Sequence, residues 1–160
     1  MMGVGKSTLG KIVAKRLDLT FIDTDRVIEK KNSMKIAEIF KKKGEEFFRL
    51  CEKKESLESL NKNKSVIALG GGAFMEKSIR DKVLKDSTSI WLEASLKTLN
   101  RRVGWNKKRP LIASGNAKLI INKLYGERKK IYKLAKYKIN CNNLTKENIL
   151  KKIITLYEKE

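Results

Sequence analysis

Short apolar, β-branched runs alternate along this chain with segments in which apolar residues recur at helical spacing. The runs that we interpret as strands are "LTFIDTD" at 19–25, "SVIALGGG" at 65–72, "TSIWLEA" at 88–94 and "YKINC" at 137–141. Strands that alternate with helices favour a parallel sheet covered by helices on both faces. Ligands of such sheets bind beyond the carboxyl ends of the strands. We therefore expect a single α/β domain over residues 1–160, with a site at that edge.

Helical periodicity predicts the elements between these runs. The predicted helices cover the stretch after residue 5, then 26–31, a segment from an N-cap at Ser33 to a stop at Gly44, 45–60, 77–84, 96–103, 117–135 and a last helix from Thr145. The polar segment "GWNKKRPLIASGN" at 104–116 breaks the pattern and holds the only proline. It is typical of a mobile surface loop.

The stretch "GVGKST" at 3–8 opens the first amphipathic helix and ends like a phosphate-binding loop. Its backbone N–H groups and the helix N-terminus can cradle phosphates, Lys6 can reach the β/γ oxygens and Ser7 can ligate Mg²⁺. The loop signature has its first glycine one residue before Met1, and a strand should precede that glycine. We therefore expect the natural protein to start upstream, and the loss of a central strand to threaten folding, because its neighbours would lack ladder partners.

Two carboxylates, Asp23 and Asp25, end the first predicted strand. In an extended chain this spacing points both toward the crevice, one for a metal shell and one for a substrate hydroxyl. An Asp N-cap explains Asp25 equally well without any catalytic role.

Three further features are candidates for substrate contacts. Arg49 and Glu52 are neighbours on one helix face, next to Phe47, Phe48 and Cys51, so the arginine can form an anion fork in a partly buried place. The glycines at 70–72 allow a ligand to approach backbone N–H groups. Arg109 in the polar loop could act as an arginine finger or be a solvated cation, and Arg128 between two tyrosines is by itself typical of a core edge.

Composition excludes several classes of function. The chain has a formal net charge of +20 and no histidine, so proton transfer must fall to a carboxylate, a lysine or water. Most basic residues are lysines mixed with carboxylates on helix faces, which is typical of a solvated surface rather than a nucleic-acid face. Cys51 and Cys141 lack paired spacing and indicate buried reduced thiols. With no apolar run that could cross a bilayer, we expect a cytoplasmic monomer without nucleic-acid or membrane partners.

Six motifs, in this order, resemble the shikimate kinases. They are GKST at 5–8, DTD at 23–25, F-R-x-x-E at 48–52, GGG at 70–72, R-P-L at 109–111 and L-Y-x-x-R-x-x-x-Y at 124–132. The resemblance covers essentially the whole chain. It implies a P-loop NTPase-type three-layer α/β sandwich with a parallel sheet in the order 2-3-1-4-5, whose first, central strand is missing here, and a mobile lid at about 104–116. It also implies ATP-dependent phosphorylation of the 3-hydroxyl of shikimate, on the route to chorismate and the aromatic amino acids.

The resemblance implies a role for each matching position. Asp25 would orient and deprotonate the attacking hydroxyl, and shikimate would be held by Asp25, Arg49, Gly71, Gly72 and Arg128. ATP would be bound by Gly3, Val4, Gly5, Lys6, Ser7, Thr8, Arg102 and Arg109, with Lys6 and Arg109 also catalytic and Arg102 packing on the adenine opposite the turn near Asn142. Mg²⁺ would be bound by Ser7 and, through water, by Asp23.

Two alternatives stay open on the sequence. The first is another small-molecule P-loop kinase, such as a gluconate or nucleoside-monophosphate kinase. The second is a basic nucleic-acid-binding protein with a vestigial nucleotide site, for which steeply salt-dependent binding is expected.

Overall fold

The computed structural model describes residues 1–104 and 117–160 of the chain. Its elements follow the order α1 (Lys6–Arg16), β1 (Thr20–Asp23), α2 (Thr24–Asn32), α3 (Ile36–Leu60), β2 (Ser65–Ala68), a 3-10 turn η1 (Ala73–Met75), α4 (Lys77–Asp86), β3 (Ile90–Glu93), α5 (Leu96–Gly104), α7 (Ala117–Tyr132), β4 (Tyr137–Asn140) and α8 (Lys146–Tyr157). Each of the four apolar runs therefore contains a strand. The predicted alternation of strands and helices is confirmed.

The strands form two parallel pairs. In the first pair β1 lies beside β2, with Thr20 opposite Ser65, and in the second β3 lies beside β4, with Ile90 opposite Tyr137. Within the described residues no ladder joins the two pairs. In the expected order 2-3-1-4-5, β1 and β2 correspond to the strands numbered 2 and 3, and β3 and β4 correspond to those numbered 4 and 5. The expected central strand, number 1, belongs between β2 and β3.

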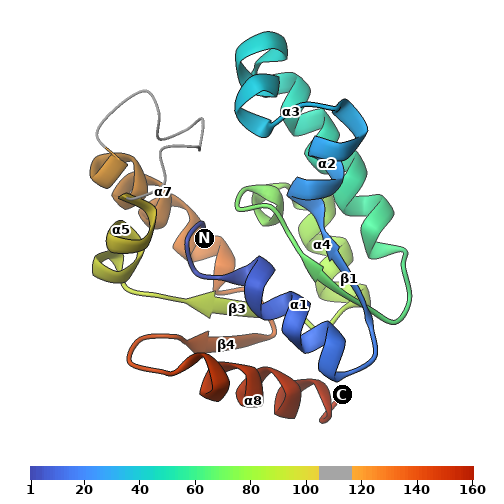
Figure 1. The fold of residues 1–160 in the computed structure, drawn as a ribbon, viewed down its shortest axis with the longest axis vertical. Helices are drawn as coiled ribbons and strands as arrows, with labels where there is room; N and C mark the ends of the chain where they lie inside the picture. Colours follow the sequence, from blue (N-terminus) through green and yellow to red (C-terminus); the bar gives the residue numbers. More distant parts are fainter. Residues whose placement is uncertain (105–116) are drawn as a thin grey trace.

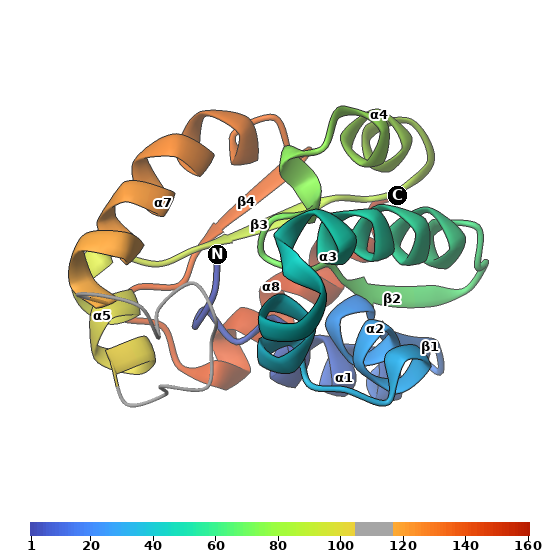
Figure 2. The same cartoon turned by 90° about the horizontal axis from the view of Figure 1, so that it is seen from above.

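Helices cover the strands on both sides. Figure 2 shows α3, α4 and α7 on one side, and α1 and α8 on the other. Figure 1 shows the β3–β4 pair and the β1–β2 pair in different halves of the molecule, with α1 between them in that view. The three-layer arrangement predicted from the alternation is therefore present.

One apolar core unites the two strand pairs. Its buried members include Leu9 and Val13 of α1, Trp91 of β3 and Ile139 of β4, and Val66 of β2 packs against it. A smaller cluster of Ile28, Ile39 and Phe48 joins α2 to α3. Because the main core draws on both pairs, the molecule packs as one unit.

Capping residues explain the helix boundaries, and at Ser33 the observed boundary differs from the predicted one. The last helix was predicted to start at Thr145, and α8 starts one residue later with Thr145 as its N-cap. The Thr145 hydroxyl accepts a hydrogen bond from the Asn148 N–H at 3.2 Å. Ser33 is not the predicted N-cap: it follows the last residue of α2 in a left-handed conformation, with φ of 50°. The next helix starts after Lys35, whose N–H is held by the Glu38 carboxylate at 2.8 Å.

The helical backbone of α3 breaks at Gly44, where one helix was predicted to stop and the next to begin. Gly44 has φ of 83° and interrupts the helical backbone, yet α3 resumes directly after it and runs to Leu60. A glycine adopts this conformation without the steric cost that other residues carry. The predicted stop at Gly44 is therefore confirmed, and α3 consists of two helical segments that meet at this kink.

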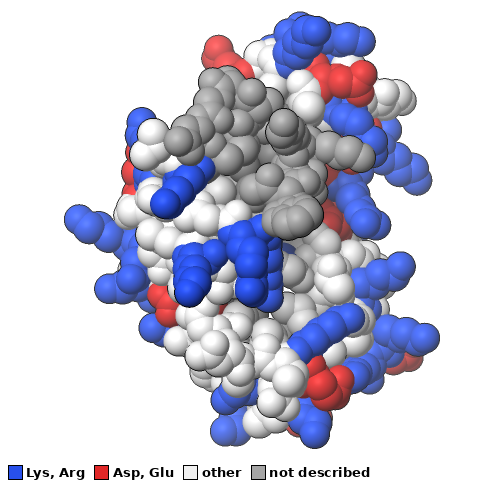
Figure 3. Space-filling view, turned by 60° about the vertical axis from the view of Figure 1, so that its left-hand side comes forward, with Lys and Arg blue, Asp and Glu red and all other residues white. Residues whose placement is uncertain are grey.

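The basic side chains are distributed rather than gathered into a single stripe. On the face shown in Figure 3, lysines and arginines lie around the whole periphery with acidic side chains among them, and one group lies near the centre of the face. Several basic side chains of the molecule are paired on its surface: Arg16 with Glu147, Lys77 with Asp81 and Lys82 with Asp86. Exposed pairs of this kind contribute little stability, about 0–1 kcal/mol each.

Candidate active site

The phosphate-loop sequence folds into an open helix N-terminus. Gly3 and Gly5 have φ of 75° and 97°, which only glycine adopts freely. The N-cap residue of α1 is Gly5, so no side chain caps the helix, and its first turn carries no acidic residue. Ser7 and Thr8 are exposed. An uncapped helix N-terminus in a glycine-rich loop is a suitable place for a phosphate group.

The Lys6 side chain lies over this loop. Its Nζ donates a hydrogen bond to the Met1 carbonyl at 3.0 Å. An ammonium held by a neutral carbonyl can exchange that partner for a phosphate oxygen, which is the stronger, charge-assisted acceptor. Lys6 is therefore positioned to contact a phosphate bound by the loop.

The triple-glycine turn after β2 is where the predicted substrate groups meet. A Cβ on Gly70 would lie 2.7 Å from Asp25 Oδ1 and 2.6 Å from Glu52 Oε1, and a Cβ on Gly72 would lie 2.6 Å from Arg49 Nη1. Such distances are shorter than a carbon atom tolerates, so a side chain at either position would displace these groups. The lack of side chains at Gly70 and Gly72 thus allows Asp25, Glu52 and Arg49 to lie close to the turn.

The middle glycine of the turn is bonded to α7 and lies near the phosphate loop. The Gly71 carbonyl accepts hydrogen bonds from Arg128 Nη1 at 2.7 Å and from the Tyr132 hydroxyl at 2.5 Å. A Cβ on Gly71 would lie 3.8 Å from the backbone nitrogen of Met2. Burial raises the pKa of Tyr132, against an opposing effect of Arg128, so the phenol remains a donor at neutral pH.

Arg49 is held between two carboxylates on its own helix. Its Nη1 donates to Glu52 Oε2 at 2.6 Å, and its Nη2 donates to Glu45 Oε1 at 2.9 Å. The Glu52 side chain is 5% exposed and the Glu45 side chain is 55% exposed. Burial opposes the arginine charge, but these two carboxylates outweigh it and raise the pKa of Arg49. Arg49 therefore remains charged and is held by Glu52 as its inner, buried partner and by Glu45 as its outer, exposed partner.

The predicted site residues divide between two adjoining cavities. Arg49, Gly72 and Arg128 line a cavity of about 530 Å³. Lys6 and Gly70 line a second cavity of about 520 Å³. The glycine turn separates the two, with Gly70 on one side and Gly72 on the other. The predicted convergence of α1, β1 and β2 at one edge is present, with the turn at its centre.

The DTD motif does not have the predicted extended geometry. β1 ends at Asp23, and Asp25 lies in the first turn of α2, so the two carboxylates do not share one face of a strand. It is Asp23, not Asp25, that caps the helix, by accepting the Arg26 N–H at 3.3 Å. Asp25 is therefore the carboxylate next to the turn, since its Oδ1 would lie 2.7 Å from a Cβ on Gly70.

Three residues that were not given a site role support this geometry, and one of them, Glu52, was expected from the sequence to lie beside Arg49. Thr24 is fully buried and bridges the strands, since its hydroxyl donates to the Ala68 carbonyl at 3.3 Å and accepts from the Gly70 N–H at 2.9 Å. Glu52 and Tyr132 are the other two. All three stand within the DTD, F-R-x-x-E and L-Y-x-x-R-x-x-x-Y motifs. The i, i+3 spacing to Arg49 was the signal for Glu52, whereas the motif alone was the signal for Thr24 and Tyr132.

The remaining predicted residues lie around the loop or outside the described chain. Arg102 is exposed at the end of α5. It lies near Cys141, whose pKa is raised by burial and lowered again by the charge of Arg102. Arg109 and the predicted lid at 104–116 lie outside the described residues, apart from Gly104 at the end of α5.

Residues 1–104 and 117–160 contain both cysteines of the chain. Both cysteines are free, with Cys141 buried and Cys51 only partly so. No group of three or more cysteine or carboxylate side chains in these ranges is arranged to hold a metal ion. None of the helices there is both long and apolar enough to span a bilayer.

Comparison with known proteins agrees with this geometry. The family model described as shikimate kinase matches residues 2–158. Among curated proteins, the shikimate kinase of Sulfurihydrogenibium sp. (strain YO3AOP1) is 38% identical over 154 residues, which covers 96% of this chain and 92% of the relative. That of Caldanaerobacter subterraneus is also 38% identical, over 99% of this chain and 92% of its own length.

Solved structures of shikimate kinases are also similar to this chain. The shikimate kinase from Acinetobacter baumannii in complex with shikimate superposes with a TM-score of 0.93 at 30% identity, over 99% of this chain and 89% of that one. The enzyme from Aquifex aeolicus superposes with a TM-score of 0.85 at 29% identity, over 99% of this chain and 92% of that one. Sequence, geometry and fold together place this chain in the shikimate kinase family.

Proposed function

We propose that this chain transfers the γ-phosphoryl group of ATP to the 3-hydroxyl of shikimate and forms shikimate 3-phosphate. The observation that carries the proposal is the glycine turn, which brings Asp25, Arg49 and Arg128 together beside the phosphate loop. The relatives named shikimate kinase and the similar structure in complex with shikimate support the same substrate.

The loop and helix α1 supply the phosphate site. The N–H groups of residues 3–8 surround the tail of the nucleotide, and Lys6 leaves the Met1 carbonyl to contact the β/γ oxygens. A bound Mg²⁺ would neutralise charge that builds up on the phosphates. Ser7 would hold it directly and Asp23 through water, and so few protein ligands are usual for this ion.

Arg49 and Arg128 bind the carboxylate of shikimate. Both arginines line one cavity, and each is fixed by an inner partner: Glu52 for Arg49 and the Gly71 carbonyl for Arg128. Glu45 is the weaker partner because it is exposed, and exposed pairs are worth at most about 1 kcal/mol. A substrate carboxylate can therefore replace Glu45 and form paired hydrogen bonds with the guanidinium.

Asp25 acts on the hydroxyl that receives the phosphoryl group. It adjoins Gly70, between the arginine cavity and the cavity that Lys6 lines. A carboxylate there can accept the proton of an alcohol and aim its oxygen at the phosphate. Because phosphoryl transfer depends mostly on positioning and charge stabilisation, the absence of histidine is no obstacle.

Arg102 and the turn near Asn142 bind the adenine. Asn142 Oδ1 accepts the Ser95 N–H at 2.8 Å and ties this turn to the start of α5. Arg102 lies near the neighbouring Cys141. A planar guanidinium stacks well on an aromatic ring, which is why this arrangement suits a nucleobase.

The proposal is tested with a coupled assay of ADP release. Circular dichroism first confirms that the chain is folded. Shikimate, gluconate and AMP are offered separately at equal concentration with ATP and Mg²⁺. We expect ADP release that depends on shikimate and is at background with the other two. Release with gluconate or AMP instead would indicate a different small-molecule kinase, and background release with all three would contradict the proposal.

A further inference from the structure

The hydrogen-bond ladder between β1 and β2 stops inside the DTD motif. It pairs Thr20 with Ser65 at one end and Asp23 with Ala68 at the other. At the first pair the Thr20 N–H donates to the carbonyl of Lys64, the residue before its partner, at 3.0 Å. This slanted pattern is typical of parallel strands, and each step along it predicts the bonds of the next pair.

The next pair would place Thr24 opposite Leu69. If β1 continued, the Thr24 carbonyl would accept the N–H of Gly70, the residue after its partner. Instead α2 begins at Thr24, and a carbonyl in the first turn of a helix points along the helix axis. The Gly70 N–H is accepted by the Thr24 hydroxyl, at 2.9 Å. The side chain therefore replaces the main-chain acceptor that the ladder loses where the helix starts.

This replacement needs one atom that both accepts and donates a hydrogen bond. The Thr24 hydroxyl does so, because it also donates its proton to the Ala68 carbonyl at 3.3 Å. Thr24 is fully buried, so bulk water does not reach this place. A side chain of the same shape without the hydroxyl would leave the Gly70 N–H without this acceptor, which is costly in a buried place.

Gly70 is also the residue against which the carboxylate of Asp25 lies. A Cβ on Gly70 would be 2.7 Å from Asp25 Oδ1. Thr24 and Asp25 are consecutive residues in the first turn of α2, so the hydrogen bond from Gly70 to Thr24 fixes where Asp25 stands relative to the glycine turn. The next glycine, Gly71, holds Arg128 through its carbonyl at 2.7 Å. One hydroxyl therefore relates the carboxylate on α2 to the guanidinium on α7.

We propose that Thr24 is a positioning residue for phosphoryl transfer, which holds Asp25 at the place where it meets the acceptor hydroxyl. The inference rests on the proposed function, in which Asp25 acts on that hydroxyl. Thr24 is fully buried and acts only through Asp25 and the Gly70 N–H. A reacting group that is displaced by a small distance slows the reaction, while groups that only bind the substrate are unaffected. The loss of the Thr24 hydroxyl therefore lowers turnover rather than affinity.

The experiment compares Thr24→Val, which keeps the shape and removes the hydroxyl, with Thr24→Ser, which keeps the hydroxyl. We expect kcat for shikimate-dependent ADP release to fall by about tenfold to a hundredfold in Thr24→Val. In Thr24→Ser it should stay within about threefold of the parent protein, because the serine hydroxyl makes the same two hydrogen bonds. The dissociation constants for shikimate and for a fluorescent ATP analogue should change less than about threefold in both variants.

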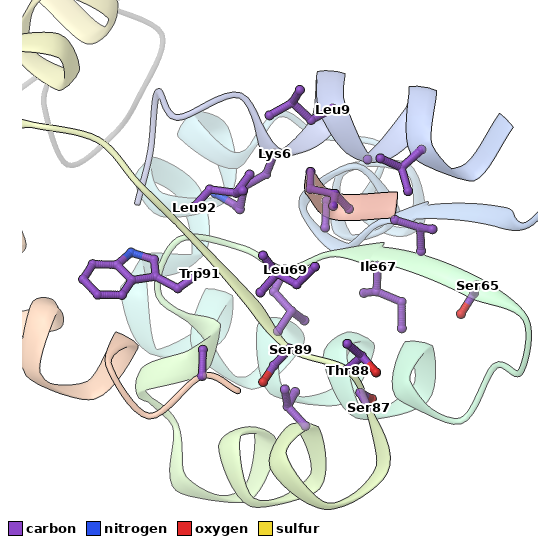
Figure 4. A pocket seen from close by; sticks show the side chains of 18 of the residues that line it. Lys6, Leu9, Ser65, Ile67, Leu69, Ser87, Thr88, Ser89, Trp91 and Leu92 are labelled. Atoms are coloured by element: carbon purple, nitrogen blue, oxygen red, sulfur yellow. The ribbon is translucent and has the colours of Figure 1, made fainter. Parts of the chain in front are cut away.

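Ser89→Ala is the matched control for the loss of a buried hydroxyl. Ser89 is buried just before β3, and its hydroxyl accepts the Lys136 N–H at 3.0 Å. Figure 4 shows Ser89 beside Thr88 and away from Lys6. We expect Ser89→Ala and Thr24→Val to lower the midpoint of thermal unfolding by similar amounts, about 2–10 °C. Only Thr24→Val should lower kcat.

Three results would overturn the proposal. A parent-like kcat in folded Thr24→Val would show that the hydroxyl does not position Asp25. A kcat as low in Thr24→Ser as in Thr24→Val would show that the methyl group matters rather than the hydroxyl. An equal loss of kcat in Ser89→Ala would show that any loosening of the core slows the reaction.

A further variant covers the case in which Thr24→Val does not fold. Thr24→Cys then takes its place, because a thiol is a weaker donor and a weaker acceptor than a hydroxyl. We expect its kcat to lie at least about fivefold below that of Thr24→Ser. Equal kcat values in these two variants would overturn the proposal.

An NMR measurement separates this inference from the proposed function. If the parent protein releases no ADP with shikimate, the proposed function has failed, and the carboxyl-carbon signal of Asp25 still reports on the place of this group. The signal is assigned by its loss in Asp25→Asn. It should move in Thr24→Val or Thr24→Cys and stay unchanged in Thr24→Ser and Ser89→Ala. An unchanged signal in every variant would overturn the positioning role by itself.

Discussion

Arg128 and Tyr132 donate hydrogen bonds to the same atom, the Gly71 carbonyl oxygen, at 2.7 Å and 2.5 Å. One turn of α7 separates the two donors, so a single helix face fixes the glycine turn. The phenol thereby also fixes where the Arg128 guanidinium can lie, because both groups share one acceptor.

Replacing Tyr132 by Phe should loosen the glycine turn without emptying the core. The hydrogen bond is lost while the ring remains, so we expect a loss of about 0.5–1.5 kcal/mol in the free energy of unfolding. Shikimate affinity should fall severalfold and the KM for ATP should stay unchanged. Urea unfolding and steady-state kinetics measure the two effects; an unchanged shikimate KM would show that Arg128 alone positions the turn.

Replacing Arg49 by Ala should mainly weaken shikimate binding. Hydrogen bonds to charged groups are worth about 1.5–3 kcal/mol, so the KM for shikimate should rise by about tenfold to a hundredfold. The matched control is Arg16→Ala, which removes an exposed arginine that pairs with Glu147 and should leave this KM unchanged. If both variants bind shikimate like the parent protein, the assignment of Arg49 is wrong.

Replacing Asp25 by Asn should lower turnover far more than nucleotide binding. The amide keeps the shape of the carboxylate but cannot accept the hydroxyl proton, so kcat should fall about a hundredfold or more. Binding of a fluorescent ATP analogue should change less than twofold. A kcat within a fewfold of the parent protein would exclude Asp25 as the general base.

Replacing Gly72 by Ala should displace Arg49, because the new Cβ would lie 2.6 Å from its Nη1. We expect the KM for shikimate to rise at least about tenfold, comparable to the loss of one charged hydrogen bond. Gly126→Ala is the control, since a Cβ there meets nothing within 4 Å. In the middle of α7 that control should stabilise the fold by about 0.5–1 kcal/mol. Equal kinetics for the two variants would mean that Arg49 has room to move.

Stability should decrease as the pH falls through the carboxylate range. The pKa of Glu147 is lowered from its ordinary value of 4.5, first by the hydrogen bond from Arg16. A carboxylate whose pKa is lower in the folded state stabilises the fold above its ordinary pKa, and this contribution is lost as the pH falls through the folded value. The midpoint of thermal unfolding should therefore drop less between pH 7 and about pH 2 in Glu147→Gln than in the parent protein. An equal drop would show that the Arg16–Glu147 pair between α1 and α8 does not contribute to the pH dependence of stability.

The sequence predicted the elements well where the signal is local. The start of the last helix near Thr145 and the four strands follow from side chains and periodicity within a few residues. It failed at Ser33, because the same residue type can end one helix or start another. Which of these occurs depends on how α2 packs on α3, through Ile28, Ile39 and Phe48.

The sequence by itself determined the six motifs, the alternation of strands and helices, and hence the family and the edge of the sheet where the site lies. Only the tertiary structure decided that Asp25 belongs to a helix and that Tyr132 shares the Gly71 carbonyl with Arg128. The physical reason is that helical and strand periodicity depend on neighbours in the chain. The contacts of Gly70, Gly71 and Gly72 instead depend on the packing of α2, α3 and α7 around one turn, which no local pattern encodes.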